Sequence, residues 1–162
     1  MRHTKKLLGL TAVMLVAACT DNLTGPRANA AGTYTLTVHG GRSIPAHYIV
    51  QPGSNNGYPD LPNGGTLDVT GGDIVLNSNG TFAETNDLLL TPPSGSSISR
   101  TFFRTGTWTL FGETLTIASG SGSNSVHDDG TVTTDANGVM TVYYLEDIDG
   151  SGTLLPFEYK RF

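Results

Sequence analysis

The segment from residue 106 to residue 118 limits the fold of this chain more narrowly than any other. A two-residue turn at Gly112 and Glu113 sets like residues opposite one another: Trp108 with Ile117, Leu110 with Leu115, and Thr109 with Thr116. A shift of one residue loses every one of these pairs. Gly112 stands at the first turn position, where a type II′ turn requires a positive φ angle. The segment therefore predicts an antiparallel β-hairpin.

Two further hairpins follow from three-residue turns that end in glycine. The turn at residues 78–80 sets Leu76 opposite Phe82, and the turn at residues 136–138 sets Val132 opposite Val142. An alternating strand covers residues 32–38. The other expected strands are residues 44–50, 66–69, 73–77, 81–90, 99–110, 113–118, 126–134, 139–146 and 154–161. Residues 66–69 and 73–77 are either two strands or one strand with a bulge at Gly71 and Gly72.

These strands predict an all-β fold. Consecutive hairpins joined by short glycine-containing turns favour an antiparallel up-and-down meander of about eight to ten strands that closes into a barrel. Closure removes the exposed sheet edges. A β-sandwich of two sheets is the alternative.

The N-terminal segment has the pattern of an export signal. Arg2, Lys5 and Lys6 precede an apolar run at residues 7–18, which is too short to cross a bilayer as a stable helix. The run ends at Cys19, the only cysteine of the chain. This pattern resembles the lipobox of bacterial lipoproteins, in which the cysteine is joined to a diacylglycerol and becomes the first mature residue. The alternative is an ordinary cleavage site of the Ala-x-Ala kind.

The expected organisation is a lipoprotein signal peptide at residues 1–18, a tether at residues 19–31 and one β-barrel domain at residues 32–162. Thr20, and not aspartate, follows Cys19, and in lipoproteins this favours the outer membrane of the bacterial cell envelope. After cleavage the chain keeps six basic and fourteen acidic residues, a net charge of −8. This charge argues against a nucleic-acid partner. The expected partner is the membrane, to which acylated Cys19 would anchor the protein.

The strand pattern is similar to that of small bacterial lipocalin-like lipoproteins. Gly32, Thr33 and Tyr34 match the Gly-x-Trp motif of the first lipocalin strand, with tyrosine in place of tryptophan. Arg161 matches the late arginine that packs over that aromatic residue. The resemblance implies a barrel that binds a small apolar or amphipathic ligand. The alternative is a structural or interaction protein of the envelope with a filled barrel and no ligand.

The candidate ligand-binding residues are Tyr34, Phe82, Phe102, Arg104 and Trp108. The same aromatic residues also fit an ordinary packed core. Arg100, Phe102 and Arg104 share one face of a strand. This trio either holds an anionic ligand or forms an exposed strand face.

Residues 147–158 carry the one motif that fits a metal ion. Asp147, Asp149, Ser151 and Glu158 occupy positions 1, 3, 5 and 12 of a calcium loop of the EF-hand type. The alternative is a hairpin turn, in which aspartate and glycine are present because they favour the backbone conformations of a turn. Asp128 and Asp129 before Gly130 fit a turn better than a ligand set. We expect no cofactor apart from this calcium ion.

No catalytic residues stand out. There is no Gly-x-Ser-x-Gly motif, and His39, His47 and His127 lie on different expected elements. We expect these histidines to be solvated or to lie at strand ends. The sequence therefore favours a protein that is not an enzyme.

The lipid anchor is tested by replacing Cys19 with serine. The hydroxyl group cannot form the thioether, so we expect Cys19→Ser to leave the membrane fraction when cells are fractionated. Thr20→Ser is the control and should stay with the membrane. A Cys19→Ser protein that remains wholly membrane-bound contradicts the anchor.

Overall fold

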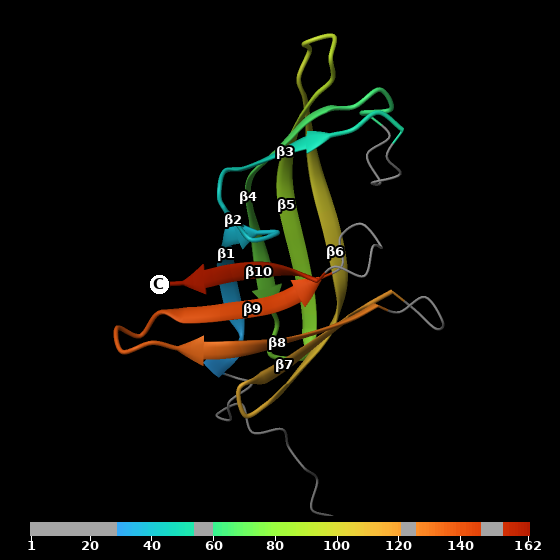
Figure 1. Cartoon of the computed structure of the whole chain (residues 1–162). Helices are drawn as coiled ribbons and strands as arrows, with labels where there is room; N and C mark the ends of the chain where they lie inside the picture. The colour runs from blue at the N-terminus through green and yellow to red at the C-terminus, as the bar shows by residue number, and fades with distance from the viewer. Residues whose placement is uncertain (1–28, 54–59, 121–125, 147–153) are drawn as a thin grey trace, which may run out of the picture.

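The computed structural model describes residues 29–53, 60–120, 126–146 and 154–162. Ten strands run through this part of the chain (Figure 1). They are β1 (Gly32–His39), β2 (Arg42–Ser43), β3 (Ala46–Val50), β4 (Gly65–Leu76), β5 (Thr81–Thr91), β6 (Ile98–Phe111), β7 (Thr114–Ser119), β8 (Val126–Thr134), β9 (Met140–Glu146) and β10 (Leu155–Arg161).

Eight of these strands form a closed antiparallel barrel. From β4 to β10 each strand pairs with the next one in the chain, and β1 closes the barrel by pairing with both β10 and β4. The short strands β2 and β3 extend the sheet beside β1 and β4. The predicted up-and-down barrel is confirmed, and the β-sandwich alternative is wrong, because one continuous sheet returns to its own first strand.

The three predicted hairpins have the predicted registers. Trp108 pairs with Ile117, Leu110 with Leu115, Leu76 with Phe82 and Val132 with Val142. Gly112 has a φ of +62°. No residue other than glycine has a positive φ in the described ranges, so Glu113 has a negative one. This combination is the type II′ turn that the sequence predicts.

The barrel has one end where long strands extend beyond their neighbours. β4, predicted either as two strands or as one, is a single strand of twelve residues whose register shifts between Val69 and Gly71. β6 pairs with β5 from Ile98 onward but with β7 only from Gly106 onward. Figure 1 shows β4, β5 and β6 rising above the level of β7 to β10. We call this the open end of the barrel.

The opposite end is closed by packing around Tyr34. The guanidinium group of Arg161 lies 5.0 Å from the centre of the Tyr34 ring, so the arginine expected from the resemblance is in place. The Tyr34 hydroxyl donates a hydrogen bond to the carbonyl oxygen of Ala30, and Arg161 donates to that of Ala31. Residues 29–31, which we placed in the tether, therefore contact the closed end.

Gly106 provides a test of how tightly the wall is packed. A Cβ atom at this position would overlap the carbonyl oxygen of Ala118 and lie 2.8 Å from the Phe82 ring. We expect Gly106→Ala to lower the free energy of unfolding by about 1–3 kcal/mol, the usual effect of overpacking. Gly71→Ala is the matched control, since its Cβ meets nothing within 4 Å. Urea denaturation measures both, and equal stabilities would contradict the packing.

Candidate functional site

Six polar side chains from five strands meet inside the barrel. We call this set the polar layer; its members are Glu84 and Asn86 of β5, Arg104 of β6, Asp128 of β8, Tyr144 of β9 and Tyr159 of β10. Each is at most 9% exposed. They point inward because alternate residues of a strand face the same side of the sheet. Glu84 and Arg104 are also direct register partners.

Arg104 joins two carboxylates in the centre of the layer. Its Nε and Nη2 atoms lie 2.8 and 2.6 Å from Oε2 of Glu84, and its Nη1 lies 2.8 Å from Oδ2 of Asp128. Nη2 also donates a hydrogen bond of 3.0 Å to the Tyr144 hydroxyl. The guanidinium group therefore bridges β5, β6, β8 and β9 through charge-assisted hydrogen bonds.

The second carboxylate oxygen of Glu84 collects the remaining donors. Oε1 accepts hydrogen bonds from the hydroxyls of Tyr144, at 2.7 Å, and Tyr159, and from Nδ2 of Asn86, at 3.3 Å. These donors, together with Arg104, offset the free-energy cost of burying the Glu84 carboxylate. Burial raises the pKa of both tyrosines well above the ordinary value, and the nearby charge of Glu84 raises it further.

Asp128 is the second buried carboxylate of the layer, and Arg104 donates a hydrogen bond to it. Burial raises its pKa, and the opposing attraction of Arg104 does not cancel this effect. The sequence had suggested a turn at this position, and that interpretation is wrong. Asp128 lies within β8, opposite Ile117 of β7, and its side chain faces the barrel interior.

His39 lies inside the barrel at the end of β1. Its ring makes an edge contact with Phe157, at a centroid distance of 4.7 Å, and is 6% exposed. The Tyr48 hydroxyl donates its proton to the His39 carbonyl, so it accepts a hydrogen bond of 3.0 Å from Nδ1 of the ring. This tautomer leaves Nε2 with a lone pair, which no described residue contacts by a hydrogen bond. Burial lowers the pKa of His39 to about 4, although Glu84 acts to raise it.

The inner face of β6 continues from the polar layer toward the open end. Phe102 stands opposite Asn86 and is 48% exposed, and Arg100 stands opposite Leu88. Arg100 donates two hydrogen bonds, of 2.8 and 2.9 Å, to the carboxylate of Asp60. Both arginines of the predicted trio therefore bind carboxylates of this chain, and the anionic ligand stays a prediction.

The five predicted ligand-binding residues fall into two groups. Tyr34, Phe82 and Trp108 are at most 2% exposed and form the floor of the barrel, where they contact other core residues. Only Arg104 and Phe102 lie at or above the polar layer. Sequence reasoning missed Glu84, Asn86, Asp128, Tyr144, Tyr159 and His39. A signal existed for the first two, which occupy inward positions between Phe82 and Leu88.

The predicted calcium loop is described only at its last position. Asp147, Asp149 and Ser151 lie outside the described residues. The Glu158 carboxylate accepts a hydrogen bond of 3.1 Å from Thr37 and lies 2.9 Å from the Lys160 ammonium group. Calcium binding stays a prediction. The described residues contain no group of three histidine, cysteine or acidic side chains that fits a metal ion.

Comparison with known proteins gives no family. No protein-family model matches the chain, and no curated protein matches it. In the part of the chain with described structure, no helix is long and apolar enough to span a membrane.

The buried position of His39 predicts how stability depends on pH. The unfolded chain protonates this histidine near pH 6.5 and the folded protein only near pH 4, so stability is present above pH 6.5 and is lost as the pH falls toward 4. The shift corresponds to about 3 kcal/mol. We expect His39→Gln to flatten this loss in urea titrations at several pH values, whereas the control His47→Gln keeps it. An unchanged slope in His39→Gln would refute the assignment.

Proposed function

We propose that this protein is a lipid-anchored, lipocalin-like lipoprotein of the bacterial cell envelope that binds one small amphipathic molecule at the open end of its barrel. The closed eight-stranded barrel and the lipobox pattern ending at Cys19 support this proposal. Barrels of this size hold at most one small ligand. The acyl chains on Cys19 would keep the barrel at the membrane, with each buried methylene contributing about 0.8 kcal/mol.

The observation that carries the proposal is a gradient of exposure along the inner face. In the floor Tyr34 is 0% and Trp108 is 1% exposed, so no water-sized space reaches them. Arg104, in the polar layer, is 9% exposed, and Phe102 above it is 48% exposed. A site for a small amphiphile needs an apolar wall next to a few polar groups, and the half-exposed Phe102 beside the polar layer supplies both. The ligand therefore sits above the polar layer, with its apolar part on Phe102.

The chemistry of the layer defines the polar end of the ligand. Burial keeps His39 neutral, so its ring carries a hydrogen-bond acceptor rather than a positive charge. With both carboxylates ionised, Glu84, Asp128 and Arg104 together carry a net charge of −1, which repels anions. A neutral or cationic amphiphile with one hydrogen-bond donor, such as an alcohol or an amine, fits these conditions.

A structural or interaction protein with a filled barrel is the second candidate. The observation in its favour is that Arg104 and Glu84 satisfy each other and that the floor is closely packed. Such a polar layer stabilises the closed barrel by its own ion pairs and hydrogen bonds, and no ligand is required. The two functions differ in whether anything occupies the space above Phe102.

Ligand binding is tested by native mass spectrometry of the full chain and by titration with N-phenyl-1-naphthylamine, a neutral apolar probe with one N–H donor. We expect a bound mass of a small amphiphile and a fluorescence increase. Phe102→Ala should weaken probe binding about tenfold, because burial of a large side chain contributes about 1.5–3 kcal/mol. Phe103→Ala is the matched control and should bind as wild type, since this neighbour faces the outer side.

Two results would contradict the proposal. One is a protein without co-purified ligand that also fails to bind the probe, which would favour the filled barrel. The other is equal weakening by both alanine variants, which would place the probe elsewhere.

A further inference from the structure

Within the described residues, part of one edge of β6 has no strand beside it. β5 covers β6 along one side from Ile98 to Thr107, but β7 covers the other side only from Gly106 to Phe111. Among the described residues, no strand pairs with residues 99–105 on that second side. We call this segment the open edge.

The hairpin fixes which backbone groups the open edge presents. Trp108 donates its N–H to the carbonyl of Gly80, at the β5 side, so the even-numbered residues of β6 bond toward β5. Phe111 and Thr114 close the hairpin as a direct pair, so the odd-numbered residues bond toward β7. The open edge therefore presents the N–H and C=O groups of four residues: Ser99, Thr101, Phe103 and Thr105.

This edge has few of the features by which proteins usually prevent pairing; the inward-pointing Arg100 and Arg104 are the exception. It contains no proline, no lysine and no outward-facing charged residue, and it is seven residues long. Phe103 on its outer face is 63% exposed. An edge of this kind is a template for another strand.

We propose that the strand that pairs with this edge is β6 of a second copy of the chain, antiparallel to the first. Local charge favours a second copy: the open edge has no acidic residue, Arg100 is neutralised by Asp60, and Arg104 by Glu84 and Asp128. The net charge of −8 that the chain carries after cleavage therefore lies outside the open edge. An antiparallel strand pair is also self-complementary under a two-fold axis.

The length of the open edge sets the register. Residue 102 is the midpoint of residues 99–105, so an axis there uses all four presented donor and acceptor positions in each copy. Ser99 then pairs with Thr105 of the second copy and Thr101 with Phe103 of the second copy. Phe102 meets its own counterpart as a close, non-hydrogen-bonded pair.

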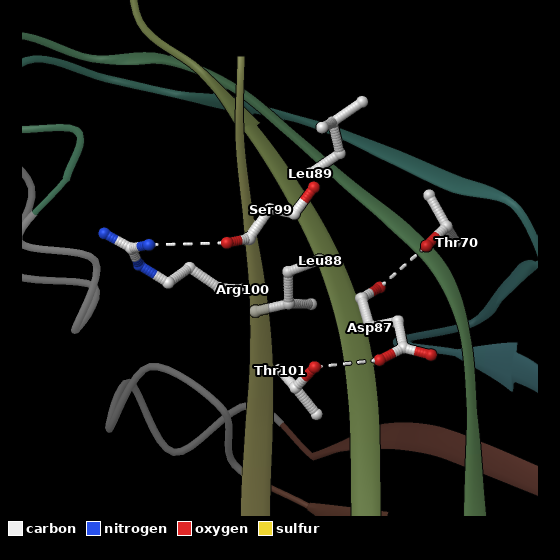
Figure 2. A pocket seen from close by; sticks show the side chains of 7 residues that line it. All are labelled: Thr70, Asp87, Leu88, Leu89, Ser99, Arg100 and Thr101. Atoms are coloured by element: carbon white, nitrogen blue, oxygen red, sulfur yellow. Dashed lines mark hydrogen bonds between the residues drawn. The ribbon is translucent and has the colours of Figure 1, made fainter.

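A hollow spans β4, β5 and β6 beside residues 99–101 of the open edge. It has a volume of about 380 Å³, and its lining residues, drawn in Figure 2, are Thr70, Asp87, Leu88, Leu89, Ser99, Arg100 and Thr101. Thr101 donates a hydrogen bond of 3.0 Å to Asp87 at its base. The two-fold register sets Phe103 of each copy beside Thr101 of the other. Each copy therefore sets its exposed ring next to a residue that lines the hollow of the other.

The test is a symmetric disulfide in the envelope of cells that make the full-length protein. Phe102→Cys places two thiols within bonding reach across the axis, and we expect an oxidised dimer on a non-reducing gel. Phe111→Cys, 91% exposed at the hairpin tip, is the control and should stay monomeric. Sedimentation of the wild-type protein should show a concentration-dependent dimer.

Backbone variants separate strand pairing from simple proximity. In the Phe102→Cys background, Thr101→Pro removes an N–H that faces the open edge and none that faces β5, so we expect the disulfide to be lost. Thr101→Val keeps that N–H and should keep the disulfide. Phe103→Ala, which alters no backbone group, should reduce it.

Three results would overturn the inference: a wild-type protein that sediments as a monomer at every concentration, no disulfide through residue 102, or equal disulfide yields in Thr101→Pro and Thr101→Val. Failure of the dimer and failure of ligand binding are distinguishable, because Phe103→Ala is expected to impair the dimer and to spare the probe, whereas Phe102→Ala weakens probe binding.

Discussion

The ion pair between Arg104 and Glu84 lies at the centre of the hydrogen bonds that join β5, β6, β8, β9 and β10 across the barrel interior. An unpaired charge inside a barrel would be strongly unfavourable, and each of these two groups is stable only because the other is present. Their neighbours extend the pair across the interior. Asp128 binds the guanidinium group from β8, and Tyr144 and Tyr159 bind the carboxylate from β9 and β10. The strands of the barrel are therefore joined by side-chain hydrogen bonds across the interior as well as by backbone hydrogen bonds around the sheet.

This polar layer divides the interior into two parts with different roles. On its lower side, Tyr34, Trp108 and the aliphatic residues of β7 form a closely packed floor that stabilises the barrel. On its upper side, β4, β5 and β6 extend beyond β7 to β10, and among the described residues part of one edge of β6 is unpaired there. The proposed ligand contact at Phe102 and the proposed dimer edge of β6 both belong to this upper part. They share one cause, which is that three strands are longer than the barrel needs for closure.

Local sequence patterns were sufficient for the hairpins but not for the interior. Turn glycines and opposed apolar pairs fixed the registers at Gly112, Gly80 and Gly138, because these depend on residues close together in the chain. The pairing of Glu84 with Asp128 through Arg104 joins three separate strands. Which inward positions reach the same level of a barrel depends on the stagger of all its strands, and no local pattern carries that information.

The sequence alone determined the strand order, the turn types and the all-β class, since period-two alternation and positive-φ glycines act over a few residues. It also identified Arg161 as the partner of Tyr34, through a resemblance. Only the tertiary structure decided that Tyr34, Phe82 and Trp108 pack in the floor, that Asp128 faces inward, and that, among the described residues, part of one edge of β6 is unpaired. These outcomes follow from barrel closure, which sets the depth of each side chain and depends on contacts between residues far apart in the chain.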